Sequence, residues 1–294
     1  MAAEDPPPEH APANASASIA TIRAVLTRIT ITRRMGVVAE RFAPLVRDQR
    51  AALLGVLAGV SGGDWARPTA CAPWTLKDVV SHLVQGELLF GGLYRSEIVD
   101  IASDTEAGVE LWRRVDGETV RYSLWHHGLA TQRVIDSRSD ESWRRVVDHS
   151  SIAGPLELRH ALRIHFYELA IHGHDVTQAL DAPNIWEERT GTLVEYCLRV
   201  APSAIARSGA ALKGVVEIRV PEAGVRTLEG SSGTSWILSS GPASVPTAVW
   251  EADAETLVLA TAGRVTPADA LERSNVAGDA GFLGAFLEAW RVTA

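Results

Sequence analysis

A glutamate and a histidine stand four residues apart in the segment 165–175, which reads His-Phe-Tyr-Glu-Leu-Ala-Ile-His-Gly-His-Asp. On an α-helix, Glu168 and His172 would project from one face, one turn apart. His165 would share that face, because seven residues make nearly two turns. A carboxylate and an imidazole placed in this way can bind one metal ion inside a helical bundle. A helix that buries hydrogen-bonded histidines has the same spacing, so a metal site needs a third ligand from elsewhere.

The third ligand is predicted upstream, in the segment Pro-Trp-Thr-Leu-Lys-Asp-Val-Val-Ser-His that ends at His82. Thr75 is a typical N-cap residue, and Asp78 three residues later gives an acidic variant of the capping box. A helix is therefore expected from Leu76, with His82 beside an apolar face. A lone histidine on such a face is usually a core residue, but its combination with the downstream Glu/His pair favours a metal site.

Together, the two segments resemble the mycothiol-dependent maleylpyruvate isomerase family, a branch of the DinB-like helical bundles. The resemblance implies that His82, Glu168 and His172 bind zinc or another divalent metal. Three protein ligands leave one position open on zinc, which is typical of a catalytic site, and a thiol bound there loses its proton. The family often has Trp at the position of His174. Because two residues turn a helix by roughly 200°, we expect His174 to pack or to support a ligand.

The resemblance further implies an enzyme that uses mycothiol, a low-molecular-weight thiol of actinobacteria, against an electrophilic small molecule. Attack on a cis-enoic acid would give isomerisation, and attack on an epoxide, halide or activated ester would give S-conjugation. The broader expectation is a thiol transferase or isomerase.

Further residues are expected to assist this chemistry. Arg264 and Arg273 are predicted to hold a substrate carboxylate or polar cofactor groups, although either could be a surface residue in an ion pair. His165 is predicted to contact the substrate or support a metal ligand. Asp175 could hold an imidazole N–H, but we favour a structural role at the end of its helix. Cys71 precedes the first ligand helix and is also expected to be structural.

Two other functions use the same residues. A metal-dependent hydrolase would place water in the open position and would act without a thiol. A non-catalytic, zinc-stabilised module that binds a small molecule would unfold on loss of metal and would turn over no electrophile.

Composition excludes several classes of protein. Of the 294 residues, 46% are hydrophobic and 22% are charged, as in ordinary globular proteins. The net charge of −8 provides no basic field for nucleic acid or anionic lipid. No apolar run is long enough for a membrane span. Two cysteines are too few for a disulfide scaffold, so a cytoplasmic setting is expected. The pattern does not specify an oligomeric state.

Three regions are expected along the chain. Residues 1–36 are a disordered or irregular extension, with a proline run and then β-branched residues mixed with arginines. Residues 37–207 are a DinB-like helical bundle, with helices at 39–59, 76–94, 106–128, 155–180 and 186–205, and a loop or short helix at 139–147. Residues 208–294 are a small α+β domain that resembles the sterol-carrier-like domain of the same family. Its expected strands are 214–220, 234–239 and 243–250, and its helices 253–264 and 278–290.

Overall fold

The computed structural model describes residues 37–96, 105–149, 154–232 and 235–292. These residues belong to one compact unit that begins at Met35. The predicted irregular extension over residues 1–36 lies outside the described residues.

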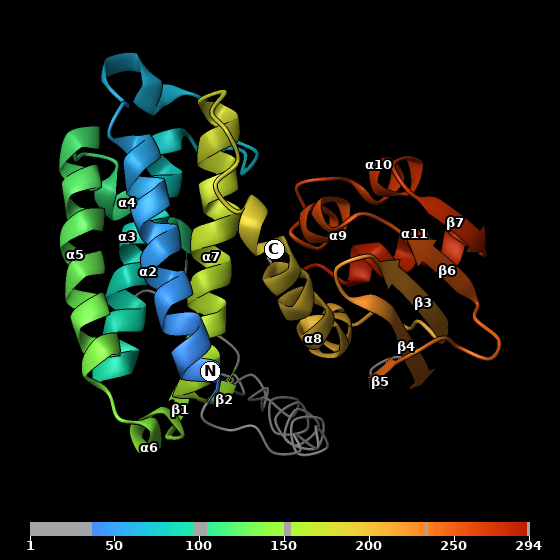
Figure 1. Ribbon diagram of the computed structural model, residues 1–294. Coiled ribbons are helices and arrows are strands. Elements are labelled where there is room, and N and C mark those ends of the chain that lie inside the picture. The colour runs from blue at the N-terminus through green and yellow to red at the C-terminus, as the bar shows by residue number, and fades with distance from the viewer. Residues whose placement is uncertain (1–36, 97–104, 150–153, 233–234, 293–294) are drawn as a thin grey trace, which may run out of the picture. The chain divides into compact units, whose positions relative to one another are not determined.

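Long helices form a bundle in the N-terminal part, as predicted (Figure 1). They are α2 (Val37–Leu57), α3 (Leu76–Arg95), α5 (Gly117–Ser137) and α7 (Leu158–Ala179). Helix α3 packs against α5 and α7, and α2 packs against the same two helices. The predicted capping box is present, because the Thr75 side chain accepts from the Asp78 backbone N–H while the Asp78 carboxylate accepts from the Thr75 N–H. This cap fixes the start of the helix that carries His82.

Shorter elements connect the long helices: η1 (Gly62–Ala66), α4 (Thr105–Trp112), α6 (Asp140–Trp143), β1 (Val146–His149) and β2 (Gly154–Glu157). The single helix expected at 106–128 is instead two helices, α4 and α5. Asp116 caps the second one by accepting from the Thr119 N–H, and Lys77 Nζ donates to the carbonyls of Arg113 and Val115 in the connection. The strands β1 and β2 pair antiparallel immediately before α7, so α7 begins three residues later than expected.

The C-terminal part is a mixed five-stranded sheet with helices, which confirms the predicted α+β class. Its elements are η2 (Glu187–Arg189), α8 (Thr190–Ser208), β3 (Gly214–Val220), β4 (Gly224–Ser232), β5 (Ser235–Ser240), β6 (Ala248–Glu251), α9 (Ala254–Thr261), α10 (Pro267–Glu272), β7 (Asn275–Gly278) and α11 (Ala280–Ala289). The strand order is β5-β4-β3-β6-β7, and only β3 and β6 pair in parallel among these strands. Strands β4 and β7 and helix α10 were not predicted from the sequence.

Helix α8 packs against β5, α9 and α11 as well as α7, so the last helix of the predicted bundle also covers the sheet. Trp290 on the α11 side donates its indole N–H to the carbonyl of Cys197 in α8, at 3.2 Å. The domain boundary at 207/208 therefore stays a prediction.

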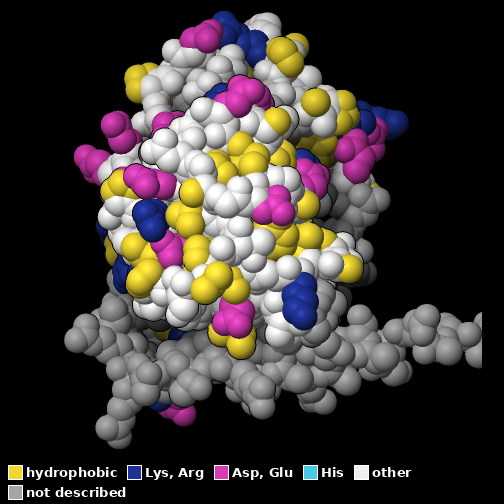
Figure 2. Space-filling view, turned by 90° about the vertical axis from the view of Figure 1, so that its right-hand side faces the viewer, with side chains coloured by type: hydrophobic (Ala, Val, Ile, Leu, Met, Phe, Trp, Pro, Cys, Tyr) yellow, Lys and Arg dark blue, Asp and Glu magenta, His cyan; other side chains and the backbone are white. Residues whose placement is uncertain are grey.

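The surface view in Figure 2 shows one face on which acidic, basic and hydrophobic side chains are interspersed. Among the described helices, none has the length and apolar character needed to cross a membrane.

Candidate metal centre

Helices α3 and α7 bring the three predicted metal ligands together. His82 projects from α3, and Glu168 and His172 from α7. The Nε2 atoms of both histidines lie 3.5 Å from Glu168 Oε2. One donor atom from each residue falls within 4.8 Å of the others. The imidazole rings stand edge to face, with centroids 4.7 Å apart.

These separations fit a divalent metal ion. Zinc bonds to nitrogen and oxygen of about 2.0–2.2 Å give a tetrahedron with edges of roughly 3.3–3.6 Å. The two measured histidine–carboxylate separations of 3.5 Å fall in that range. The His172 side chain is 7% exposed, whereas those of His82 and Glu168 are 21% and 24% exposed. The donors are thus fixed by packing on one side and reachable on the other.

Two of the three candidate ligands have the protonation state that a metal ligand needs. Burial raises the pKa of Glu168, but hydrogen bonds with the two imidazoles outweigh burial and lower it, so this carboxylate is ionised at neutral pH. Burial lowers the pKa of His82, which leaves this imidazole neutral, as a metal ligand must be. Burial also opposes charge on His172, but Asp175, Cys71 and Glu168 raise its pKa, so this ring is protonated at neutral pH and would lose its Nε2 proton on binding a metal ion.

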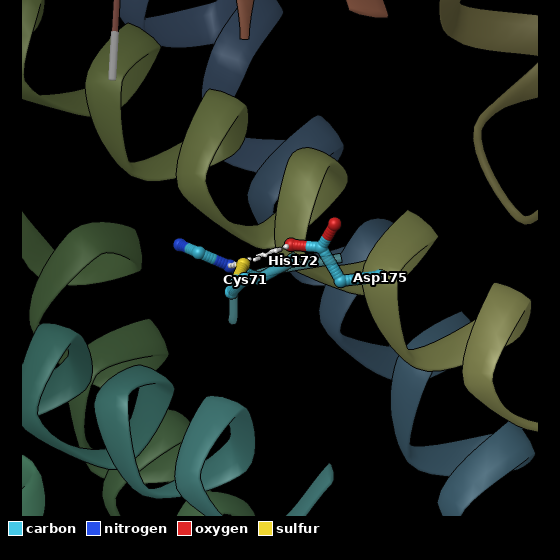
Figure 3. A group of neighbouring side chains, drawn as sticks. All are labelled: Cys71, His172 and Asp175. Atoms are coloured by element: carbon cyan, nitrogen blue, oxygen red, sulfur yellow. Dashed lines mark hydrogen bonds and ion pairs between the residues drawn. The ribbon is translucent and has the colours of Figure 1, made fainter. Parts of the chain in front are cut away.

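Asp175 orients the His172 ring. Its Oδ2 lies 2.9 Å from His172 Nδ1 (Figure 3). The other ring nitrogen, Nε2, lies 3.5 Å from Glu168 Oε2. Arg264 in turn donates from Nε to Asp175 Oδ1 and from Nη2 to Oδ2, each at 2.8 Å. A carboxylate on the outer nitrogen of a ligand histidine fixes its tautomer and orientation at many metal sites. We favoured a structural role for Asp175 from the sequence, but the structure shows the alternative, in which Asp175 holds an imidazole N–H.

Cys71 lies beside this carboxylate (Figure 3). Its Sγ is 3.0 Å from Asp175 Oδ2, 2.9 Å from Arg264 Nη2 and 3.8 Å from His172 Nδ1. Cys71, His172 and Asp175 therefore form a second possible set of metal donors. The Arg264 guanidinium already contacts two of these three donors and brings its own positive charge. This cation opposes a metal ion there, so the set of His82, Glu168 and His172 fits better.

Sequence reasoning assigned Cys71 a structural role and did not place it at the site. No local signal could have done so, because Cys71 meets Asp175 and Arg264 across 104 and 193 residues of chain.

The other predicted residues lie in different surroundings. Arg264 reaches the site through Asp175, as described. Arg273 ends α10 and lines a cleft with Arg219, Glu251 and Asn275, a group that contains none of the metal donors. Its expected part in catalysis stays a prediction.

His165 is buried two turns before His172. Its Nδ1 lies 3.2 Å from the Tyr94 hydroxyl, its Nε2 lies 3.2 Å from Glu87 Oε1, and Phe90 stacks on the ring at 4.4 Å. These contacts fix the ring in the bundle interior; a contact with substrate stays a prediction. His174 is also buried and stacks on Trp186 at 4.8 Å, in agreement with the packing expected for it.

Comparison with known proteins agrees with this geometry. Residues 46–177 match the family model described as the mycothiol maleylpyruvate isomerase N-terminal domain. All three proposed metal ligands fall inside this range. The match confirms the resemblance predicted from the two motifs. No curated protein matches the sequence of this chain.

Solved structures extend the likeness in fold. A crystal structure of the mycothiol-dependent maleylpyruvate isomerase is similar with a TM-score of 0.64 at 11% identity, covering 81% of this chain and 92% of the other. A mutant of that enzyme gives a TM-score of 0.60 at 12% identity with the same coverage. At these identities the similarity shows the fold alone. A crystal structure of sterol carrier protein 2 has 18% identity over 35% of this chain and 96% of its own, but its TM-score of 0.26 is too low to support the predicted sterol-carrier resemblance.

Proposed function

We propose, on the premise that residues 46–177 carry a mycothiol maleylpyruvate isomerase N-terminal domain, that this chain is a metal-dependent, thiol-using transferase or isomerase. His82, Glu168 and His172 would hold zinc or another divalent ion. When bound, such an ion supplies a thiolate at neutral pH from a low-molecular-weight thiol, for which mycothiol is the proposed cosubstrate. The second substrate is an electrophilic small molecule.

One observation carries this proposal: both histidine Nε2 atoms lie 3.5 Å from the same carboxylate oxygen, although His82 and Glu168 are 86 residues apart in the chain. Hydrogen-bonded core histidines would not require two imidazoles and one carboxylate to converge at the edge length of a metal tetrahedron. Partial exposure of His82 and Glu168 leaves room for a small cosubstrate next to them.

The remaining residues of the site position these donors. Asp175 holds His172 Nδ1, so that the ring keeps Nε2 toward the shared centre. Arg264 keeps Asp175 ionised, because its guanidinium and the His172 imidazole together outweigh burial and lower the pKa of that carboxyl. The Arg264 side chain is 11% exposed, so it also offers a cation at the edge of the site. We propose that it attracts an anionic substrate group, while roles for Arg273 and His165 remain predictions.

The test begins with metal content, measured by elemental mass spectrometry on the wild type, His172→Ala and the control His126→Ala. His126 is an exposed histidine on α5, so the metal content of His126→Ala shows whether zinc binds adventitiously to surface histidines. We expect about one metal ion per chain in the wild type and the control, and none in His172→Ala.

Calorimetric titration with mycothiol follows on the same three proteins. Binding to the wild type and the control only, with consumption of an electrophile such as a cis-enoic acid or an epoxide, would support the proposal. Turnover that needs no thiol would identify a hydrolase. Zinc loss that unfolds the chain, with no turnover at all, would identify a binding module. A wild type without metal would refute the site.

A further inference from the structure

A second charged cluster lies apart from the metal donors, where the first turns of α7 meet α2 and α8. We call it the arginine cluster. It consists of Arg41 on α2, Arg159, His160 and Arg163 on α7, and Arg199 on α8, with the carboxylates of Glu157 and Glu195. None of these residues takes part in the proposed chemistry.

Arg163 is the unusual member of the cluster. It is 8% exposed, yet among the described residues it forms no ion pair with a carboxylate. Its contacts are a hydrogen bond from Nη1 to His160 Nδ1, at 3.0 Å, and the face of the Phe42 ring, 5.5 Å from the guanidinium carbon. A buried guanidinium without a counter-charge costs free energy, which proteins usually avoid by pairing it.

The neighbouring carboxylates already form ion pairs with other arginines. Glu195 lies 2.9 Å from Arg41 and 3.5 Å from Arg199, and Glu157 pairs with Arg159. Arg41 and Arg199 share the single carboxylate of Glu195, and Arg163 has no carboxylate partner, which leaves two positive charges unbalanced within the described residues.

Two pKa shifts agree with this excess of positive charge. Burial and the arginines Arg163, Arg159 and Arg199 lower the pKa of His160 to about 4, so the ring is neutral and can accept from Arg163. Burial and Arg199 lower the pKa of Arg163 to about 10 despite the attraction of Glu195.

The cluster is reachable from solvent. The side chains of Arg41 and Arg199 are 43% and 37% exposed. Because His160 Nδ1 accepts from Arg163, its proton lies on Nε2, which gives a further N–H donor. Planar guanidinium groups match the oxygens of phosphate and carboxylate in charge and in geometry.

We propose that the arginine cluster is a binding site for a small oxyanion of the phosphate class, held by Arg163, His160 and Arg199. The anion would supply the counter-charge that the described residues lack. This site is independent of the proposed metal chemistry, so either assignment can fail without the other.

The test uses inorganic phosphate and the full-length protein. Calorimetry and thermal unfolding are measured against phosphate concentration, with chloride added to keep the ionic strength constant. We expect saturable binding of one phosphate per chain and a saturable rise in Tm. Phosphate also stabilises proteins in general by exclusion from their surface, but that effect does not saturate and is shared by all variants.

Arg163→Gln should weaken phosphate binding about tenfold or more, because it removes a charged hydrogen-bond donor of the proposed site. Its Tm without phosphate should equal or exceed that of the wild type, because an unbalanced buried charge is removed. Arg199→Gln changes a more exposed side chain and should also weaken binding, which keeps the test valid if Arg163→Gln fails to fold. The control Arg133→Gln removes an exposed charge from α5 and should bind like the wild type.

Glycerol 3-phosphate distinguishes the source of the anion. If it binds as tightly as inorganic phosphate, the site accepts the phosphate group of a larger molecule. If only inorganic phosphate binds, the site takes the free ion. Absence of saturable binding by the wild type, or equal binding by Arg163→Gln, would overturn the proposal.

Discussion

Replacement of Asp175 by Asn tests how the proposed metal site is supported. The side chain is fully buried, and its two oxygens bind His172 Nδ1 and Arg264. Asparagine keeps the shape but removes the charge, and its amide nitrogen can face the imidazole as a donor. The ring then loses the group that holds its proton on Nδ1 and directs Nε2 at Glu168.

The magnitude follows from two separate losses. Loss of a supporting carboxylate typically lowers metal affinity by about 10–100-fold, or about 1.4–2.7 kcal/mol. In addition, Arg264 loses the carboxylate that balances its charge, while its side chain is 11% exposed. Breaking a buried pair from one side costs about 3–5 kcal/mol, and the remaining exposure of Arg264 places the expected loss of unfolding free energy near the lower figure.

Two assays separate these effects. Competition with a chromophoric chelator gives zinc affinity, and urea unfolding of the metal-free protein gives stability. The control Asp181→Asn makes the same chemical change just beyond α7, at a side chain that is 90% exposed, and should alter neither quantity appreciably.

The double variant Asp175→Asn/Arg264→Gln decides between the two explanations. We expect it to recover stability, because no lone guanidinium remains, but not zinc affinity, because the imidazole still lacks its carboxylate. Recovery of zinc affinity in the double variant would refute the orienting role of Asp175 and assign its effect to the charge of Arg264. Unchanged affinity in the single variant would refute it as well.

Three other predictions concern a buried carboxylate and two closely packed glycines elsewhere in the fold. Burial raises the pKa of Glu87, but His165 and Arg50 lower it from 4.5 to about 2. The contribution of this carboxylate to stability is therefore present above pH 4.5 and is lost as the pH falls toward 2. The urea midpoint should depend less steeply on pH across this range in Glu87→Gln than in the wild type. Gly278→Ala should lower the free energy of unfolding in urea by about 1–3 kcal/mol, because φ is +85° and the new Cβ would lie 2.5 Å from the Thr247 carbonyl oxygen. The control Gly284→Ala would have its nearest neighbour at 3.8 Å and should not destabilise the protein. Gly117→Ala would place a Cβ 2.3 Å from the Trp65 ring, and a loss of about 1–3 kcal/mol with a changed tryptophan fluorescence should follow.

The convergence of the three candidate metal donors could be predicted because the signals that place each of them are local. The i, i+4 spacing of Glu168 and His172 and the cap at Thr75 each arise within one helix, and α-helical geometry converts such spacing directly into a shared face. The family resemblance then supplied the pairing between the two helices, which spacing alone does not give.

The missed elements have weaker local patterns. Strand β4 contains two glycines and two serines and was not predicted as a strand, but pairing with β3 and β5 on both sides makes it a central strand. At the break between α4 and α5, Lys77 from another helix binds the carbonyls of the connection, in addition to the local cap at Asp116. Partners distant in sequence take part in both outcomes, and the periodicity of the sequence does not report them.

The residues that support the metal donors depend on contacts distant in sequence for the same reason. Residues 46–177 include the three donors, Asp175 and Cys71, whereas Arg264 lies outside this range, after α9. Yet Arg264 makes two 2.8 Å bonds to the carboxylate that orients His172. The helical part therefore supplies every proposed ligand, while the C-terminal part supplies the cation that keeps the orienting carboxylate charged. A change that moves Arg264 away from Asp175 leaves the three donors in place but weakens the hold of Asp175 on His172. Such changes in the C-terminal part should therefore lower metal affinity, even though this part contributes no proposed ligand.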